Sequence, residues 1–203
     1  MIFAYNPKHV SDTLMVITAD DKSMKQATER KGNVARLTTE DGRVIGWNFF
    51  EISKEMPIEE TGQVTLSHEQ VNQLNQFIHA QGFEETLVVD DTPKFVVGFV
   101  KTCVPHEDSD HLSVTEIEVD NGEVLQIVCG AANIRKGLKV VVAKPGAMMP
   151  DGLLIWPGEL RGVASFGMVC SAKELNLANA PMKRGILELP ADAVVGEAFP
   201  VGK

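Results

Sequence analysis

Cysteine is scarce in this sequence, and a long hydrophobic run is missing from it. The 203 residues include three cysteines, Cys103, Cys129 and Cys170, which lie far apart. An odd number of widely spaced cysteines argues against a disulfide framework and favours a reducing compartment. No stretch approaches the roughly 18–20 apolar residues of a membrane span, and the first residues lack the basic and apolar segments of a signal peptide. We therefore expect a cytoplasmic protein that does not cross a membrane.

The motifs of common enzyme and metal sites are also missing. The sequence contains no Walker loop, no dinucleotide fingerprint and no catalytic-triad order. Cys103 and His106 have the spacing of two zinc ligands, but no C-x-x-C pair completes the set. His106 and Asp110 could act as an acid–base pair, yet no nucleophile accompanies them, so a hydrogen bond that closes the loop is the simpler interpretation. We expect no catalytic residues, no metal and no cofactor.

Positive charge is in deficit, but the deficit is uneven along the chain. The formal net charge is −9, with 19 Lys and Arg against 28 Asp and Glu. Residues 1–92 hold 8 basic and 15 acidic residues, whereas residues 93–203 hold 11 and 13. An acidic total opposes indiscriminate binding to nucleic acid, because affinity for phosphates rises with clustered Lys and Arg. The basic residues of the second half are bunched, so a local basic patch remains there.

Residues 1–92 have the pattern of a small acidic α+β domain. The dipeptide Asp41-Gly42 stands between two apolar β-like runs and is typical of a hairpin turn. Ser67 opens a helix in capping-box form with Gln70 three residues later. The polar segment 90–93 follows and ends in proline, which disfavours helix in the residue before it. We place the domain boundary at residue 92.

Residues 93–203 instead predict a small barrel of short strands. Apolar runs recur at intervals of roughly 8–12 residues with turn signals between them. We expect strands at 95–104, 112–119, 124–129, 138–143 and 166–170, with a helical turn after the third. Ser171 and Glu174 then form a second capping box, which predicts a short helix. The pattern suggests an OB-fold, so the predicted class is mainly β: a five-stranded β-barrel (OB-fold) preceded by a small α+β domain.

Several spaced motifs in this half resemble a known family. They are 97–100, His106-x-x-Ser109-Asp110-x-Leu112, 126–133, 142–147 and 160–171. The stretch from Phe95 to about residue 177 is similar to the tRNA-binding domain of phenylalanyl-tRNA synthetase β subunits, methionyl-tRNA synthetase appendages and free-standing tRNA-binding proteins. The front domain and the overall length resemble the free-standing bacterial members. Glu107 and His111 depart from the family, which often has proline and a basic residue there.

The resemblance implies an OB-fold that binds the outer corner of folded tRNA without catalysis, and no binding of DNA. OB-folds combine positive charge with apolar surface, and structured RNA is read through its shape, phosphates and ribose hydroxyls. We expect RNA contacts from a set of cations, one amide and two hydroxyls: Asn133, Arg135, Lys136, Lys139, Lys144, Arg161, Ser165 and Ser171. The family also implies a homodimer.

Each of these residues has a structural interpretation as well. Asn133 could hold a loop through backbone bonds, and Ser171 could be only a helix cap. Arg161 could form a salt bridge with Glu159 or Glu174.

Two other functions are open on the sequence. The fold resembles export chaperones of the CsaA type, which bind polypeptide, and an apolar groove lined by Met148, Met149 and Trp156 would favour that function. The acidic front domain could instead dock an aminoacyl-tRNA synthetase, with the protein as an accessory subunit. Binding of tRNA, binding of polypeptide and co-purification of a synthetase would separate the three functions.

Overall fold

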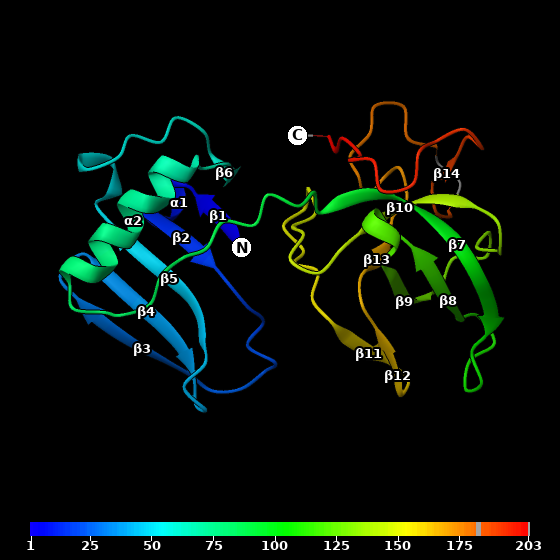
Figure 1. Cartoon of the computed structure of the whole chain (residues 1–203), viewed down its shortest axis with the longest axis horizontal. Coiled ribbons are helices and arrows are strands. Elements are labelled where there is room, and N and C mark those ends of the chain that lie inside the picture. The colour runs from blue at the N-terminus through cyan, green and yellow to red at the C-terminus, as the bar shows by residue number, and fades with distance from the viewer. Residues whose placement is uncertain (182–183, 203) are drawn as a thin grey trace. The chain divides into compact units, whose positions relative to one another are not determined.

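The computed structural model describes residues 1–181 and 184–202 of the chain. The chain divides into two compact units (Figure 1), Met1–Asp91 and Thr92–Lys203. Each unit has its own hydrophobic core. Both units are built mainly from antiparallel β-strands. The division falls one residue before the boundary that the linker composition suggested.

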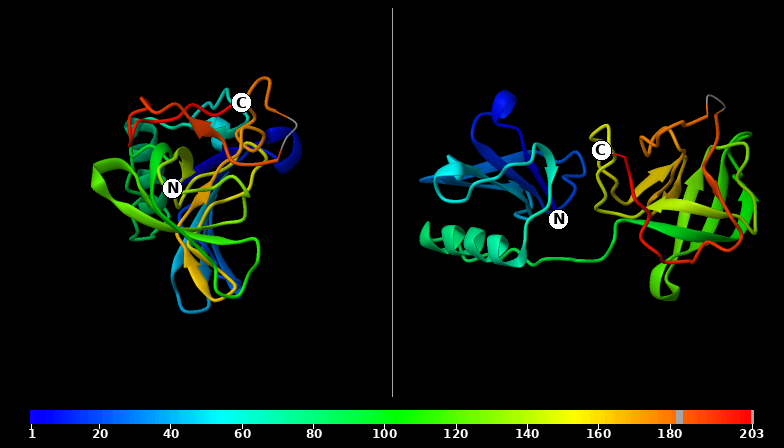
Figure 2. Two further views of the ribbon diagram at one scale, coloured as in Figure 1. Left: turned by 90° about the vertical axis from the view of Figure 1, so that its right-hand side faces the viewer. Right: turned by 90° about the horizontal axis from the view of Figure 1, so that it is seen from above.

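The first unit is a six-stranded sheet with one long helix on one face. The sheet has the order β3-β4-β5-β2-β1-β6. Its strands are β1 (Ile2–Tyr5), β2 (Thr13–Ile17), β3 (Gln26–Lys31), β4 (Val34–Thr39), β5 (Val44–Phe50) and β6 (Gly62–Val64). The helices are α1 (Pro7–Val10), the short 3-10 helix η1 (Ile52–Lys54) and α2 (His68–Ala80). Figure 2 shows α2 running along one face of this sheet.

Helix α2 begins where the capping box predicts. The Gln70 amide donates to the Ser67 hydroxyl at 3.2 Å, and the Ser67 amide donates to the Gln70 side chain at 2.9 Å. Both bonds satisfy amides that the start of a helix leaves without partners. The apolar face of α2 places Leu74 and Ile78 in the same core as Trp47 of β5. The helix is therefore fixed both by its first turn and by its packing on the sheet.

The second unit is a nearly closed β-barrel. Its main sheet has the order β13-β10-β7-β8-β9, and β14 also pairs with β10. The strands are β7 (Phe95–Pro105), β8 (Ser113–Glu118), β9 (Val124–Cys129), β10 (Lys139–Ala143), β13 (Met168–Val169) and β14 (Glu188–Leu189). The short 3-10 helix η2 (Asp120–Gly122) connects β8 to β9, and a separate hairpin consists of β11 (Gly158–Leu160) and β12 (Val163–Ser165). The mainly β class predicted from the sequence is confirmed.

The segment that carries β12 joins the two ends of the barrel sheet. The Phe166 amide donates to the carbonyl oxygen of Gln126 in β9 at 2.8 Å, and the Gln126 side chain donates to the carbonyl oxygen of Ala164 at 2.7 Å. The Val128 amide donates to the hydroxyl of Ser165 at 3.1 Å. These three bonds link β9 to the chain that continues into β13, so the barrel has little open edge.

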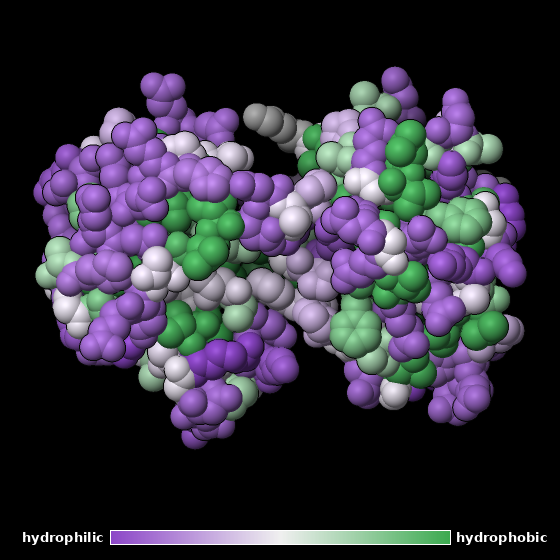
Figure 3. Space-filling model, in the orientation of Figure 1, coloured by the Kyte–Doolittle hydropathy of each residue, from purple (hydrophilic) through white to green (hydrophobic). Residues whose placement is uncertain are grey.

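Two apolar clusters lie on opposite faces of β10. Val140 and Val142 face the barrel interior, whereas Val141 and Ala143 belong to a second cluster built with the loops that cover β10. This alternation follows from the two-residue repeat of a strand. On the face drawn in Figure 3, hydrophilic residues dominate and apolar residues reach the surface in smaller groups.

Two elements differ from the sequence-based expectation. The fifth strand, expected over 166–170, is only Met168–Val169, because Gly167 turns the chain with a φ of 134° immediately before it. Ser171 and Glu174 make both capping-box hydrogen bonds, at 2.7 and 3.2 Å, but turns follow in place of the expected helix. A positive φ of 51° at Asn176 ends the coil after one turn.

Candidate nucleic-acid interface

Asn133 ties the loop after β9 to the segment that precedes β14. Its side chain donates to the carbonyl oxygen of Ile186 and accepts from the amide of Ile186, both at 3.0 Å. It also donates to the Glu188 carboxylate at 3.0 Å. Gly185 makes this approach possible, because it has a φ of 143° and a Cβ there would lie 2.7 Å from the Asn133 side-chain oxygen. Asn133 therefore holds two loops together.

The three cations of this loop and of β10 differ in the hydrogen bonds that their side chains make within the chain. Arg135 makes two hydrogen bonds to the Glu188 carboxylate, at 2.9 and 2.8 Å, and this contact raises the pKa of the guanidinium. The Lys139 ammonium donates to two backbone carbonyl oxygens after β14, at 2.6 and 2.5 Å. Lys136 is exposed, and no residue within 1–181 or 184–202 hydrogen bonds to its side chain. Of the three, Lys136 is the most available to a ligand.

Three further expected contact residues support the fold. Lys144 is 7% exposed, and its ammonium pairs with the Asp120 carboxylate of η2 at 2.7 Å. Ser165 is buried and accepts the Val128 amide that closes the barrel. The Ser171 hydroxyl accepts from the amide of Glu174. These polar groups already have partners within the chain, which reduces their availability to another molecule.

Arg161 occupies the tip of the β11–β12 hairpin, beside a groove of about 470 Å³. Its guanidinium donates to the backbone carbonyl oxygen of Asp108, in the loop between β7 and β8, at 2.9 Å. The salt bridge to Glu159 or Glu174 considered from the sequence is not formed between these described residues. The groove is lined by Glu107 and Asp108 as well as by Arg161, so its charge is mixed.

His106 connects the same loop to the same hairpin. It is 4% exposed, its Nδ1 accepts from the Asp108 amide at 3.0 Å, and its Nε2 lies 3.2 Å from the carbonyl oxygen of Leu160. Because an amide can only donate, Nδ1 is the acceptor and the ring proton resides on Nε2. Asp110 bonds to His111 at 2.9 Å instead, and this contact lowers the pKa of the Asp110 carboxyl. The loop-closing interpretation of His106 holds, with partners other than Asp110.

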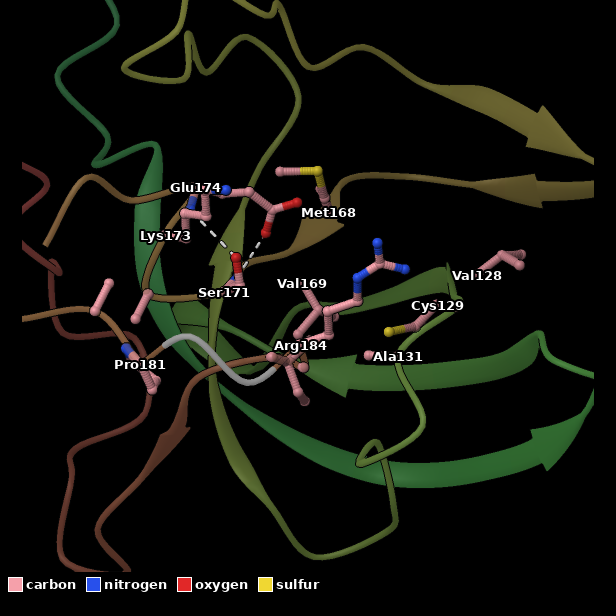
Figure 4. A pocket seen from close by; sticks show the side chains of 15 residues that line it. Val128, Cys129, Ala131, Met168, Val169, Ser171, Lys173, Glu174, Pro181 and Arg184 are labelled. Atoms are coloured by element: carbon pink, nitrogen blue, oxygen red, sulfur yellow. Dashed lines mark hydrogen bonds between the residues drawn. The ribbon is translucent and has the colours of Figure 1, made fainter.

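A larger pocket, of about 670 Å³, lies beside the end of β9 (Figure 4). Its lining comes from positions 128–131, 168–169, 171–174, 180–181 and 184–186. Arg184, which sequence reasoning missed, directs its guanidinium into this space. Within the described ranges no residue forms a hydrogen bond or an ion pair with that side chain. A cation followed by glycine, the pattern shared by 136–137 and 161–162, is the signal that could have identified it.

The described residues contain no group of three or more His, Cys, Asp or Glu that could hold a metal ion. Cys129 and Cys170 are buried in the second unit, and burial raises the pKa of both thiols, that of Cys170 to about 12. No helix in the described part of the chain is long and apolar enough to cross a membrane. Met149 is 2% exposed and belongs to the core cluster behind β10, so it cannot line the apolar groove considered for a polypeptide.

Two family models match the chain. The description "Putative tRNA binding domain" matches residues 95–198, which is the barrel unit, and "Domain of unknown function (DUF4479)" matches residues 21–90. A solved structure described as "Crystal structure of MetRS related protein from Pyrococcus horikoshii" covers 56% of this chain and 96% of its own, with 23% identity and a TM-score of 0.37. A TM-score of 0.37 is too low to support an argument about this chain.

Among curated relatives, the "Putative tRNA-binding protein YtpR" of Bacillus subtilis is 47% identical over 196 residues, which is 96% of this chain and 97% of the relative. The phenylalanine–tRNA ligase β subunit of Idiomarina loihiensis is 50% identical over 112 residues, which is 55% of this chain but only 14% of that subunit. The similarity to the ligase is thus confined to one domain of a much longer protein. The chain belongs to the family of YtpR-like proteins that carry the "Putative tRNA binding domain".

Proposed function

We propose that this protein binds folded tRNA through its second unit, acts in the cytoplasm and catalyses no reaction. One observation carries the proposal. The family match over residues 95–198 coincides with the barrel, and it contains cations without an intramolecular partner among the described residues: Lys136, Lys173 and Arg184. Phosphate is the ligand that such cations attract most strongly in RNA.

The eight residues expected at the interface divide into two groups in this proposal. The cations on the surface contact phosphates directly: Arg135, Lys136, Lys139 and Arg161. The others hold the loops and strands that present those cations: Asn133, Lys144, Ser165 and Ser171. Arg135 and Arg161 have to exchange an internal acceptor for a phosphate, whereas Lys136 loses no such bond on binding.

The test is a titration of unfractionated tRNA at two salt concentrations, beside an unstructured RNA of equal length. We expect saturable binding that prefers tRNA and weakens with salt, because phosphate contacts release counterions. Lys136→Glu should weaken binding of all tRNAs similarly. Lys25→Glu, at an exposed lysine of the first unit, makes the same change in net charge and should leave the affinity unchanged. Absence of binding at low salt would refute the proposal.

A second candidate concerns protein partners. We propose that the chain forms a homodimer and that its first unit docks an aminoacyl-tRNA synthetase. The 15 acidic and 8 basic residues of positions 1–92 favour a basic partner surface, and the domain of the ligase relative is part of a synthetase subunit. Light scattering that gives the mass of one chain would exclude the dimer. Failure of purified phenylalanyl-tRNA synthetase to bind the full chain would exclude that synthetase as the partner.

A further inference from the structure

We infer that the pocket beside Arg184 binds a single unpaired nucleotide of the tRNA, with a phosphate against the Arg184 guanidinium and the base against the apolar wall. The inference rests on the proposed function and narrows it to one site and one chemical class. The site lies among residues 128–131, 168–169, 171–174, 180–181 and 184–186, and Ser171 was among the residues expected to contact RNA.

The charge of Arg184 is the first support for this site. Within residues 1–181 and 184–202 no carboxylate or carbonyl group bonds to it, although Arg135 and Lys144 of the same unit are both paired with carboxylates. Figure 4 shows the guanidinium between the Met168 side and the Cys129 side of the pocket. A planar guanidinium with five donors fits a phosphate through two parallel hydrogen bonds.

The backbone at Arg184 is the second support, because its neighbours hold it in place. Gly185 adopts a conformation that favours glycine, and Ile186 is bound through both its amide and its carbonyl group to Asn133. Arg184 is therefore attached to a fixed segment on its C-terminal side. The fixed backbone on this side lowers the conformational entropy that the segment loses on binding, while the side chain itself remains unbonded among the described residues.

The lining of the pocket is the third support. Met168, Val169, Ala172 and Ile186 supply apolar surface, and Lys173 adds a second cation without a partner among the described residues. The Glu174 carboxylate also lines the pocket, and it accepts a hydrogen bond from the Ser171 amide. A thioether and aliphatic side chains can cover the flat face of a base, and a guanidinium plane can stack on it. The amphipathic lining thus matches a nucleotide, which combines an apolar face with a charged group.

The size of the pocket restricts which nucleotide it can take. A volume of about 670 Å³ lies within the roughly 300–1,000 Å³ of small-molecule sites. Such a space admits one nucleotide but not a base-paired helix. The ligand must be an unstacked nucleotide, which folded RNA offers at its single-stranded end and in its loops.

The first experiment compares Arg184→Gln with wild type in the full chain, by fluorescence anisotropy with intact tRNA. We expect about a tenfold loss of affinity and a decrease of about one in the slope of log affinity against log salt. Lys101→Gln is the matched control, because it removes one charge from an exposed, carboxylate-paired lysine of the same unit. Arg184→Lys should restore the salt slope and only part of the affinity.

A second measurement distinguishes a base in the pocket from a phosphate at its rim. The methyl signal of Met168, assigned with Met168→Leu, should shift on addition of tRNA because a base ring lies against it. A titration with tRNA trimmed of its single-stranded 3′ end identifies the source. If the trimmed RNA no longer responds to Arg184→Gln, the nucleotide comes from that end, and an undiminished response assigns it to a loop.

The outcomes separate the inference from the function on which it rests. The nucleotide pocket would be overturned, and the proposed function left intact, by one combination of results. In it tRNA binding is salt-dependent, Arg184→Gln has the affinity of wild type, and the Met168 methyl signal does not shift. A shift of affinity without a shift of the Met168 signal would reduce the site to a phosphate contact and overturn the base assignment. No tRNA binding by the wild-type chain would overturn both.

Discussion

Asn133 bonds to both backbone groups of Ile186, so its removal is expected to weaken the second unit. Asn133→Ala leaves the amide and carbonyl of the buried residue Ile186 without their partners. We expect a loss of about 1–3 kcal/mol in the free energy of unfolding, the range for unmatched polar groups. Urea denaturation followed by circular dichroism measures it.

Lys136→Ala is the control for this substitution. Lys136 lies in the same loop as Asn133, its side chain is exposed, and no described residue hydrogen bonds to that side chain. Its effect should stay within about 0.5 kcal/mol, as is usual at such surface positions. Equal stability of the two variants would show that the bonds of Asn133 do not stabilise the fold.

Cys170 should contribute a dependence of stability on alkaline pH. Burial raises the pKa of its thiol to about 12 in the folded chain, against about 8.5 for an unfolded thiol. Below about pH 8.5 neither state ionises, so its contribution is fully present there. As the pH rises toward about 12 the unfolded state loses the proton first, so the free energy of unfolding falls.

Urea midpoints measured at about pH 8 and about pH 10.5 test the Cys170 contribution. The decrease between them should be smaller in Cys170→Ala than in wild type. The comparison uses the difference between two pH values because the cavity of the smaller side chain lowers stability at every pH. An identical decrease in both proteins would contradict the assignment to Cys170.

The sequence was informative about single residues whose partners are close in the chain. Ser67 and Ser171 were identified as capping residues because the amides that they accept lie three positions away. Asn133 and Lys144 were assigned to RNA because their partners, 53 and 24 residues distant, cannot be found by local spacing. An exposed cation and a buried, paired one look the same in a sequence.

At the scale of elements, the β11–β12 hairpin is linked to the loop before β8 by the His106 ring and by the bond from Arg161 to Asp108. His106→Ala removes the acceptor for the Asp108 amide and the donor to Leu160. We expect faster hydrogen exchange at Asp108 and Val163, whose surroundings open, and a loss of about 1 kcal/mol in stability. Exchange followed by nuclear magnetic resonance measures both sites.

His106→Asn separates the two bonds of the ring. The asparagine oxygen lies close to the position of Nδ1 and can accept from the Asp108 amide, but the side chain is too short to reach Leu160. Protection of Asp108 should therefore return in this variant while the hairpin stays loosened. Full protection of both segments in His106→Ala would contradict a role for the ring in joining them.

The strand Val124–Cys129 has the bounds that the sequence predicts, because an apolar run there follows the turn signal of Asn121-Gly122. The last strand is shorter than predicted because the apolar residues after Gly167 serve two different elements. Met168 and Val169 pair with β10, whereas Cys170 already leaves the strand and enters the cluster behind it. An apolar run indicates that its residues are buried, but it does not indicate whether they belong to a strand or to a loop.

At the scale of the whole molecule, each unit has a separate core, so the barrel should fold without the first unit. We expect residues 92–203 to unfold cooperatively and to bind tRNA with the salt slope of the full chain. Thermal unfolding and the tRNA titration measure these properties. An unfolded fragment would show that the barrel requires residues 1–91, whereas a folded fragment without tRNA affinity would place part of the interface in the first unit.

The charge of the whole molecule also bears on the interface. A total of −9 did not reveal that the cations of the second unit fall into paired and unpaired groups, because pairing is a property of the fold. The family motifs therefore predict the barrel, whereas the cations that support it differ from those open to a ligand only in their partners within the fold.

In the proposed interface, the Glu188 carboxylate competes with a tRNA phosphate for the Arg135 guanidinium. A phosphate that approaches Arg135 has to displace a carboxylate held by two hydrogen bonds. An isolated phosphate group gains little from that exchange, whereas a polymer that engages the open cations at the same time raises the effective concentration at Arg135. Because both partners of this pair are exposed, the pair itself is weak. It therefore gives linked phosphates a modest advantage over free phosphate and mononucleotides at Arg135.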